Sequence, residues 1–354
     1  MNREELWGKL RDEGLVSGDM PMDQASSSPW PVRAMLGIAG WLGALFLLGF
    51  AGATFAILFR KAEAAIPAGL ICCGAAFAAF RGSPRSDFVG QFGFAISLAG
   101  QGLILFGLGN AMGDQAAAAM FLLMAVVEAV LVVALPNYIH RVFTTWVAVL
   151  CVSVASVKLG LPGLASTGAA CGAAFFWLSP VRMASRSDLW EPVGIGLALG
   201  LVQVEGAVLV GDELWRVVFR AYTATPFWVA RLGPAMVGVV LAYTVWTLLA
   251  RSGVSPQSRA GGLVLAAAAV LAIGGLGAPG VAAAVLILVL GFANGNRVLM
   301  GLGLLALAAY LSHFYYQLHL TLLVKSMVLA ATGTALLAIR WSVGRFVPEE
   351  RADA

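Results

Sequence analysis

Long apolar runs separated by short polar stretches fill the chain from about residue 34 onward. A helix needs roughly 20 apolar residues to cross the hydrocarbon core of a bilayer, and about 17 to 25 are tolerated. The run at 281–293 is shorter than a full crossing, so it could instead be re-entrant. The pattern therefore predicts an all-α, polytopic bundle of ten to twelve transmembrane helices, twelve when every run is counted: 34–59, 64–80, 89–112, 116–135, 142–157, 160–179, 193–211, 233–250, 260–276, 281–293, 298–313 and 319–339.

Polar segments at both ends and near the middle predict the domain limits. Residues 1–30 are charged and lack the apolar core of a signal peptide, and the capping-box spacing of Asn2 and Glu5 predicts a short helix there. That helix lies either on the membrane surface or on a partner. We therefore expect an N-terminal helix and linker at 1–30, a membrane domain at 31–342 and a cytoplasmic tail at 343–354. The segment 179–192 divides the membrane domain into six spans and six.

Composition supports a membrane protein. Hydrophobic residues make up 60% of the 354-residue chain and charged residues 11%, with a mean hydropathy of +0.89, which leaves too little polar surface for a soluble globule. The net charge of +4 is spread over short loops without a basic stripe, so we expect the lipid bilayer and no nucleic acid as a partner. The four cysteines lie in apolar runs and lack the spacing of a zinc site or a disulfide framework.

The distribution of basic residues predicts the orientation. With the N-terminus in the cytoplasm, fifteen of the 22 Lys and Arg residues fall on the cytoplasmic side and six on the opposite side, with Lys325 inside the last span. This bias places both termini in the cytoplasm. The outer loop between the seventh and eighth spans breaks the pattern, because Arg216 and Arg220 lie among aromatic residues. We expect Leu214 to Tyr222 to form a helix in the outer interface, which either anchors the chain or docks an extracytoplasmic partner.

Three ionisable residues lie inside predicted spans: Glu128, Glu205 and Lys325. Each costs about 2.5 to 3.5 kcal/mol on insertion scales, so such residues usually face the protein interior. A rise of about 1.5 Å per residue places Lys325 and Glu205 at a similar depth, with Glu128 as the second possible partner of the lysine. Together with Thr321 on the Lys325 face and Gln203 beside Glu205, they form a candidate intramembrane polar site. Its role is either a structural ion pair or transport or proton relay, or else Lys325 extends to the outer interface.

Enzyme signatures are missing from the sequence. It has no HExxH, GxSxG or P-loop motif and no paired aspartates suited to intramembrane proteolysis. The three histidines fall on opposite sides of the predicted membrane, which argues against a shared metal site. We therefore expect a non-enzymatic protein with no catalytic residues, no metal and no cofactor.

Three passages resemble one protein family: YYQLHLTLLVKS near the C-terminus, GNRVLMGLGL before it and EAVLVVALPNYIHR in the centre. They are similar to bacterial integral membrane proteins grouped as domain of unknown function 4401, and the likeness extends to the N-terminal LWGKLRDEGLV. The resemblance implies a multi-pass protein of the bacterial inner (cytoplasmic) membrane, often encoded beside another membrane protein of unknown function and a small protein with a GDYxxLxY motif. It implies no activity. The motif positions, without roles, are Glu128, Pro136, Asn137, His140, Arg141, Asn296, Arg297, Tyr315, Tyr316, Lys325 and Ser326.

Two functions remain open at this point. The first is a non-enzymatic subunit of a membrane assembly that has an extracytoplasmic partner. The second is a secondary transporter or exporter of a small molecule, with the polar site of Glu and Lys at its centre. A transporter should have a water-filled cavity that reaches the polar site, whereas a subunit should have a closed core and an apolar lateral face.

Overall fold

The computed structural model describes residues 30–54, 62–82, 86–113, 116–210, 227–278 and 280–317, and the single positions Trp7, Lys9, Arg11, Asp12 and Thr334. Outside the described residues lie the predicted last span at 319–339, the outer helix at 214–222, most of the N-terminal helix and the C-terminal tail. Lys325, Thr321 and Ser326 are among them.

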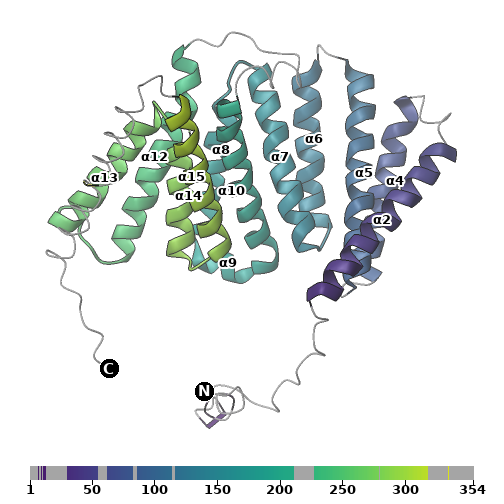
Figure 1. The fold of residues 1–354 in the computed structure, drawn as a ribbon, viewed down its shortest axis with the longest axis horizontal. Coiled ribbons are helices and arrows are strands. Elements are labelled where there is room, and N and C mark those ends of the chain that lie inside the picture. The colour runs from purple at the N-terminus through teal and green to yellow at the C-terminus, as the bar shows by residue number, and fades with distance from the viewer. Residues whose placement is uncertain are drawn as a thin grey trace. The chain divides into compact units, whose positions relative to one another are not determined.

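The described part of the chain is built from α-helices, as the sequence predicted (Figure 1). Each predicted span from 34–59 to 298–313 overlaps one of them. Within the described residues, six helices are long and apolar enough to cross a membrane, and the shorter apolar ones include Leu164–Trp177, Arg259–Gly275 and Val281–Ala293. The helices are α2 (Trp30–Thr54), α4 (Ala62–Gly82), α5 (Asp87–Met112), α6 (Ala117–Ala134), α7 (Tyr138–Lys158), α8 (Leu164–Trp177), α9 (Pro180–Ser185), α10 (Ser187–Val210), α12 (Phe227–Arg251), α13 (Arg259–Gly275), α14 (Val281–Ala293) and α15 (Arg297–Gln317).

The chain divides into two compact units, residues 1–107 and 108–354. In the first unit, α4 packs closely on α5. A Cβ added to Gly69 of α4 would lie 2.6 Å from the Gly100 carbonyl oxygen of α5, so only glycine allows this approach. The Trp41 indole of α2 donates to the Gln91 side chain of α5 at 3.1 Å.

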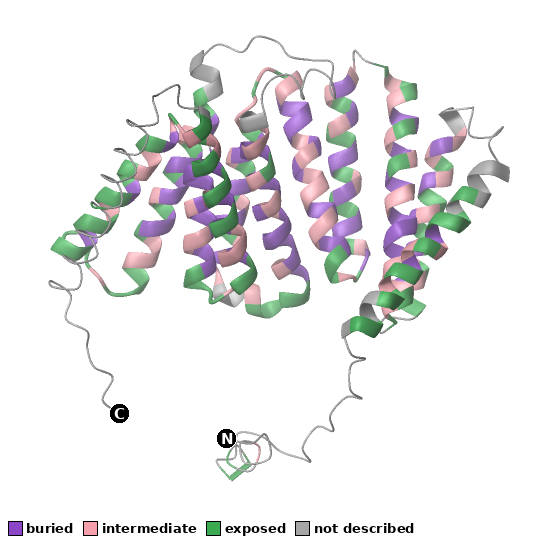
Figure 2. Cartoon of the chain, in the orientation of Figure 1, coloured by how far each residue is buried: buried purple, intermediate pink, exposed green. Residues whose placement is uncertain are grey.

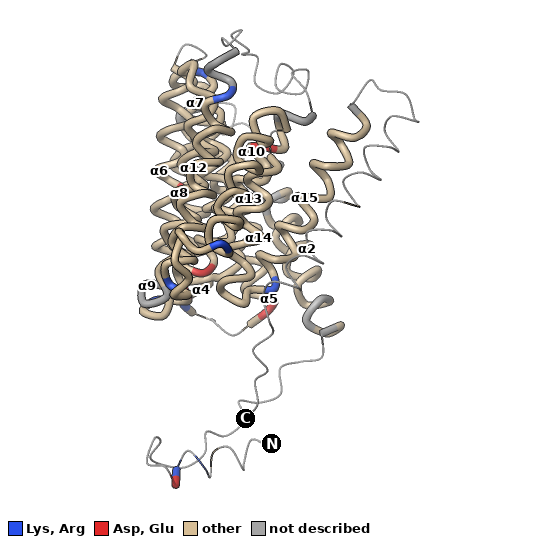
Figure 3. Tube along the Cα trace, turned by 90° about the vertical axis from the view of Figure 1, so that its left-hand side faces the viewer, with Lys and Arg blue, Asp and Glu red and all other residues tan. Residues whose placement is uncertain are grey.

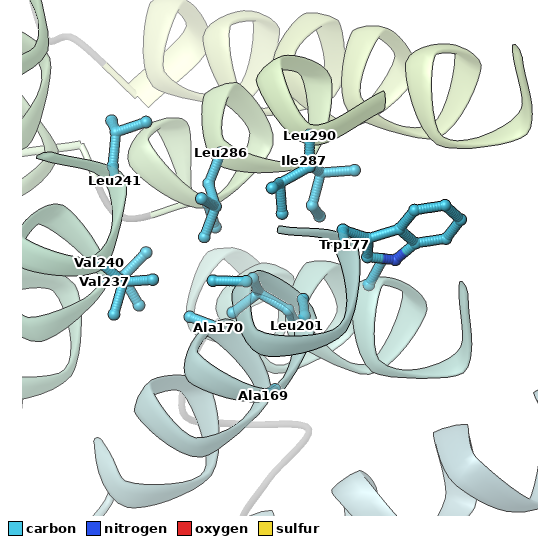
Figure 4. Packing of buried hydrophobic residues seen from close by; sticks show 14 of the residues in the cluster. Ala169, Ala170, Trp177, Leu201, Val237, Val240, Leu241, Leu286, Ile287 and Leu290 are labelled. Atoms are coloured by element: carbon cyan, nitrogen blue, oxygen red, sulfur yellow. The ribbon is translucent and has the colours of Figure 1, made fainter. Parts of the chain in front are cut away.

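The second unit has its core where α8, α10, α12 and α14 meet. Leu201, Leu241, Leu286 and Leu290 are fully buried there, and they belong to one packed cluster with Ala169 and Ala170 of α8 (Figure 4). Small residues on α8 let the neighbouring helices approach its backbone, which is how helices pack when no water drives them together.

Where the structure describes the connections of this unit, they reverse the chain between successive helices and lie at two ends (Figure 1). One end, which we name the arginine end, holds the turns at 135–137, 252–258 and 294–296 and the segment 178–186, which contains α9. The opposite end holds the turns at 159–163 and 276–280 with Lys158 and Arg231. Figure 3 shows the charged residues mostly near helix ends. Six arginines belong to the arginine end: Arg141, Arg182, Arg186, Arg251, Arg259 and Arg297.

Several helices in this unit have exposed surfaces (Figure 2), and large apolar side chains lie on them. On α6, Val126, Val130 and Val133 are each more than half exposed, and Leu305 on α15 is 71% exposed. Monomeric soluble proteins rarely present contiguous apolar stripes of this kind along a helix. The surface therefore suits contact with lipid tails or with another membrane helix.

Candidate functional site

Two of the passages that resemble the family, EAVLVVALPNYIHR and GNRVLMGLGL, both contact the start of α10 at the arginine end of the second unit. The α6–α7 turn at 135–137 is extended at Asn137, and the Asn137 side chain accepts a hydrogen bond from the His140 backbone at 3.0 Å. Asn137 thus caps α7 and fixes the direction in which that helix leaves the turn. The His140 side chain is buried in the first turn that follows.

Arg141 joins three helices. Its Nε donates to the Val132 carbonyl oxygen at the end of α6 at 3.1 Å, and one terminal nitrogen donates to the Asp188 carbonyl oxygen of α10 at 2.8 Å. The same nitrogen lies 3.4 Å from the Asp188 carboxylate, whose side chain is 81% exposed. Because water screens an exposed carboxylate, the bonds to backbone oxygens account for most of what Arg141 contributes.

Glu191 connects the start of α10 to two further helices. It accepts a hydrogen bond from the Tyr138 hydroxyl of α7, and the Asn296 amide nitrogen lies 3.4 Å from one of its oxygens. The Asn296 side-chain oxygen in turn accepts from the backbone nitrogens of the first turn of α15, at 3.0 and 3.1 Å. Asn296 therefore caps α15 and bonds to α10 at once. We refer to Tyr138, Arg141, Asp188, Glu191 and Asn296 as the motif cluster.

The other family positions lie apart from these contacts. Pro136 is exposed in the α6–α7 turn, and Arg297 is exposed at the start of α15. Tyr315 and Tyr316 lie near the far end of α15, with ring centroids 5.6 Å apart. Ser326 and Lys325 lie outside the described residues.

Glu205 forms a second centre, toward the opposite end of the unit. Only 4% of it is exposed, and it is hydrogen-bonded to the Ser166 side chain of α8 and to the Gly280 backbone N–H, directly before α14. Ser166 belongs to the first turn of α8, so the carboxyl group lies at the N-termini of two helices. Such ends carry partial positive charge and stabilise a carboxylate.

Tyr310 of α15 completes this centre. Its hydroxyl donates to the Val202 carbonyl oxygen of α10 at 2.6 Å, and its ring covers Gly280. Gly280 has a φ of +90°, and a Cβ added to it would lie 2.8 Å from the ring, so glycine is required there for two reasons. We refer to Ser166, Glu205, Gly280 and Tyr310 as the Glu205 cluster.

Glu128 has different surroundings. It is completely buried on α6, and neither carboxyl oxygen has a hydrogen-bond partner among the described residues. It lies close enough to Cys151 of α7 for its charge to act on the thiol. Gln203 is exposed on α10 and accepts a 3.1 Å hydrogen bond from the Trp146 indole. No described contact joins Glu128, Gln203 and Glu205, and a partnership of either glutamate with Lys325 stays a prediction.

Sequence reasoning did not single out the partners in these centres. Asp188 and Glu191 lie in the polar segment that we used only to divide the chain, although acidic residues at the start of an apolar run are a recognisable signal of a helix N-terminus. Ser166 and Tyr310 carry no such signal. Among the residues that the structure describes, no three His, Cys, Asp or Glu side chains form a group suited to a metal ion.

Comparison with known proteins gives a family. The family model described as Domain of unknown function (DUF4401) matches residues 29–346, nearly the whole chain. No curated protein and no solved structure matches the sequence. The chain therefore belongs to the DUF4401 family.

Proposed function

We propose that this protein is a non-enzymatic, multi-pass subunit of an assembly in the bacterial inner membrane, with an extracytoplasmic partner. The single observation that carries the proposal is the closed interior of the second unit. Among the described residues of this unit, the buried carboxyl groups are Glu128 and Glu205, which are 0% and 4% exposed, so packed helices separate both from water. A transporter poised to accept its substrate would expose such groups to one side of the membrane.

The lateral surface supports an assembly as well. Apolar faces on α6, α13 and α15 leave large side chains such as Val130, Leu263 and Leu305 exposed. These faces suit lipid and can also receive the membrane helix of another subunit, since helices in lipid associate by packing. The orientation with about twelve spans and both termini in the cytoplasm agrees with the six arginines at one end of the second unit.

The test uses the full chain in its native membrane at its native level. A photo-crosslinking amino acid is placed at Val130, Leu263 or Leu305, and the buried Leu286 serves as the control position. We expect one or two exposed positions to give a crosslink of defined mass to a single membrane protein that has an extracytoplasmic part. The control should give none. Crosslinks only to lipid at every exposed position would contradict the proposal.

One observation favours transport as a second candidate. The helices α8 and α14, of 14 and 13 residues, are shorter than a membrane crossing, and both begin at the Glu205 carboxyl group. Transporters often place the N-termini of short helices at a central site. For this candidate we expect purified protein in vesicles to conduct an ion or small solute, and Glu205→Gln to abolish that flux while the protein remains folded. Absence of flux across a panel of ions would count against it.

A further inference from the structure

The interface between α6 and α7 encloses a carboxyl group to which the proposed function assigns no chemical role. Glu128 is fully buried there, and its two oxygens lack hydrogen-bond partners among the described residues. An ionised carboxylate needs donors or a counter-charge to remain in such a place, because burial removes the water that stabilised it. The neutral acid has a far smaller cost of burial.

The geometry of α7 shows what faces this carboxyl group. His140, Thr144 and Cys151 follow at intervals of four and seven residues, so they share one face of α7, and all three are buried. Thr145 and Val149 contact α10 at two of its glycines. With about 100° between successive residues, the face with Cys151 points away from α10 and toward α6. The Glu128 interaction with Cys151 agrees with this placement.

On the described helices that pack against α6, charged groups near this interface are engaged elsewhere. On α7, the Arg141 side chain is bound to the Val132 carbonyl oxygen and to Asp188. On α10, Glu191 bonds to Tyr138, while Leu189 and Val193 pack on α6. His140, the other titratable group on the face that points to α6, interacts electrostatically with Arg141.

Glu205 makes a useful contrast. It is nearly as buried as Glu128, yet it is hydrogen-bonded to the Ser166 hydroxyl and accepts from the Gly280 N–H, at two helix N-termini. The Glu205 carboxyl group therefore caps the N-termini of α8 and α14. Glu128 has no comparable hydrogen bond among the described residues, so the two glutamates have different chemistry in spite of similar burial.

We propose that Glu128 is a proton-binding site in the α6–α7 interface and carries its proton at neutral pH. The ligand is a proton taken from water, which forms an O–H bond on one carboxyl oxygen, and no other bond changes. Glu128 is then a neutral acid in the α6–α7 interface, close enough to Cys151 of α7 for an electrostatic interaction. This assignment does not depend on whether the protein is a subunit or a transporter.

Infrared spectroscopy of the full chain in lipid discs tests the proposal, since the C=O stretch of a protonated carboxyl group is separate from the bands of ionised carboxylates. The spectrum of the wild type minus that of Glu128→Gln should show one lost acid band at neutral pH. Glu205→Gln should leave that band in place. Loss of carboxylate bands in Glu128→Gln, without loss of an acid band, would overturn the proposal.

A second comparison keeps Glu128 and so remains informative if Glu128→Gln does not fold. Cys151→Ala removes the thiol that interacts electrostatically with Glu128 and should shift the frequency of the acid band. Cys171→Ala, which changes an exposed cysteine on α8, should not shift it. An acid band that responds equally to both replacements, or to neither, would show that the protonated group is not Glu128.

Discussion

Single side chains join the helices of the second unit at both of its ends. Arg141 bonds to backbone oxygens of α6 and α10, and Glu205 bonds to α8 and to the residue before α14. The sequence identified both residues, one as a family position and one as an ionisable residue in an apolar run. It could not identify Ser166 or Asp188 as their partners, because pairing between distant helices depends on how the bundle packs.

Replacement of Arg141 should destabilise the fold. Arg141→Gln removes a buried cation that holds three helices, and loss of one member of such a network costs about 3 to 5 kcal/mol when the pair is fully buried. Since Asp188 is largely exposed, we expect about 2 to 3 kcal/mol here, mainly from lost bonds to backbone oxygens. Thermal unfolding in detergent measures the change. Arg186 is exposed, so Arg186→Gln is the control, and its free energy of unfolding should remain within about 0.5 kcal/mol of the wild type. An equal loss of stability in both variants would contradict the role of Arg141.

Gly280 should tolerate no side chain. Gly280→Ala places a Cβ at a left-handed backbone position, which costs about 1 to 2 kcal/mol, and presses it into the Tyr310 ring, which costs roughly another 1 to 3 kcal/mol. Gly277→Ala in the same turn is the control, because its Cβ would have no neighbour closer than 3.7 Å. Unfolding midpoints of the two variants should differ clearly. Equal midpoints would show that Tyr310 does not press on Gly280.

Helices could be predicted well from apolar run length, and their ends less well. The run 160–179 contains a helix only at 164–177, because Gly160 has a φ of +76° and Pro162 follows in the same turn. Apolar residues continue through such turns, so hydrophobicity alone does not mark where a helix begins. The shorter helix matters, since it brings the start of α8 to Glu205.

Close packing of α10 on α7 depends on glycine. A Cβ added to Gly196 would lie 2.6 Å from both the Val142 carbonyl oxygen and the Thr145 Cβ. Gly196→Ala should therefore separate the two helices and destabilise the fold by about 1 to 3 kcal/mol. Gly168→Ala on α8, which meets nothing within 4 Å, should be neutral or stabilising by up to about 1 kcal/mol. Chemical denaturation in mixed micelles compares them, and a stable Gly196→Ala would contradict the close contact.

At the scale of the whole molecule, alternating helix direction gathers residues that are far apart in the sequence. The turns at 135–137 and 294–296 and the segment 178–186 share one end of the second unit, which is why residues from two family passages and the start of α10 meet in the motif cluster. Run lengths and charge predicted this alternation without showing which helices would be neighbours. Our central proposal is that this arginine end faces the cytoplasm and the opposite end faces away from it.

Accessibility of single cysteines to a membrane-impermeant maleimide tests that claim most directly. In a full-length background without the four native cysteines, Leu161→Cys lies in the α7–α8 turn and Gln257→Cys in the α12–α13 turn, and both positions are exposed. With the inner membrane intact, we expect labelling of Leu161→Cys alone. After lysis, both should be labelled. Labelling of Gln257→Cys in intact cells, or equal labelling of the two positions before lysis, would contradict the account.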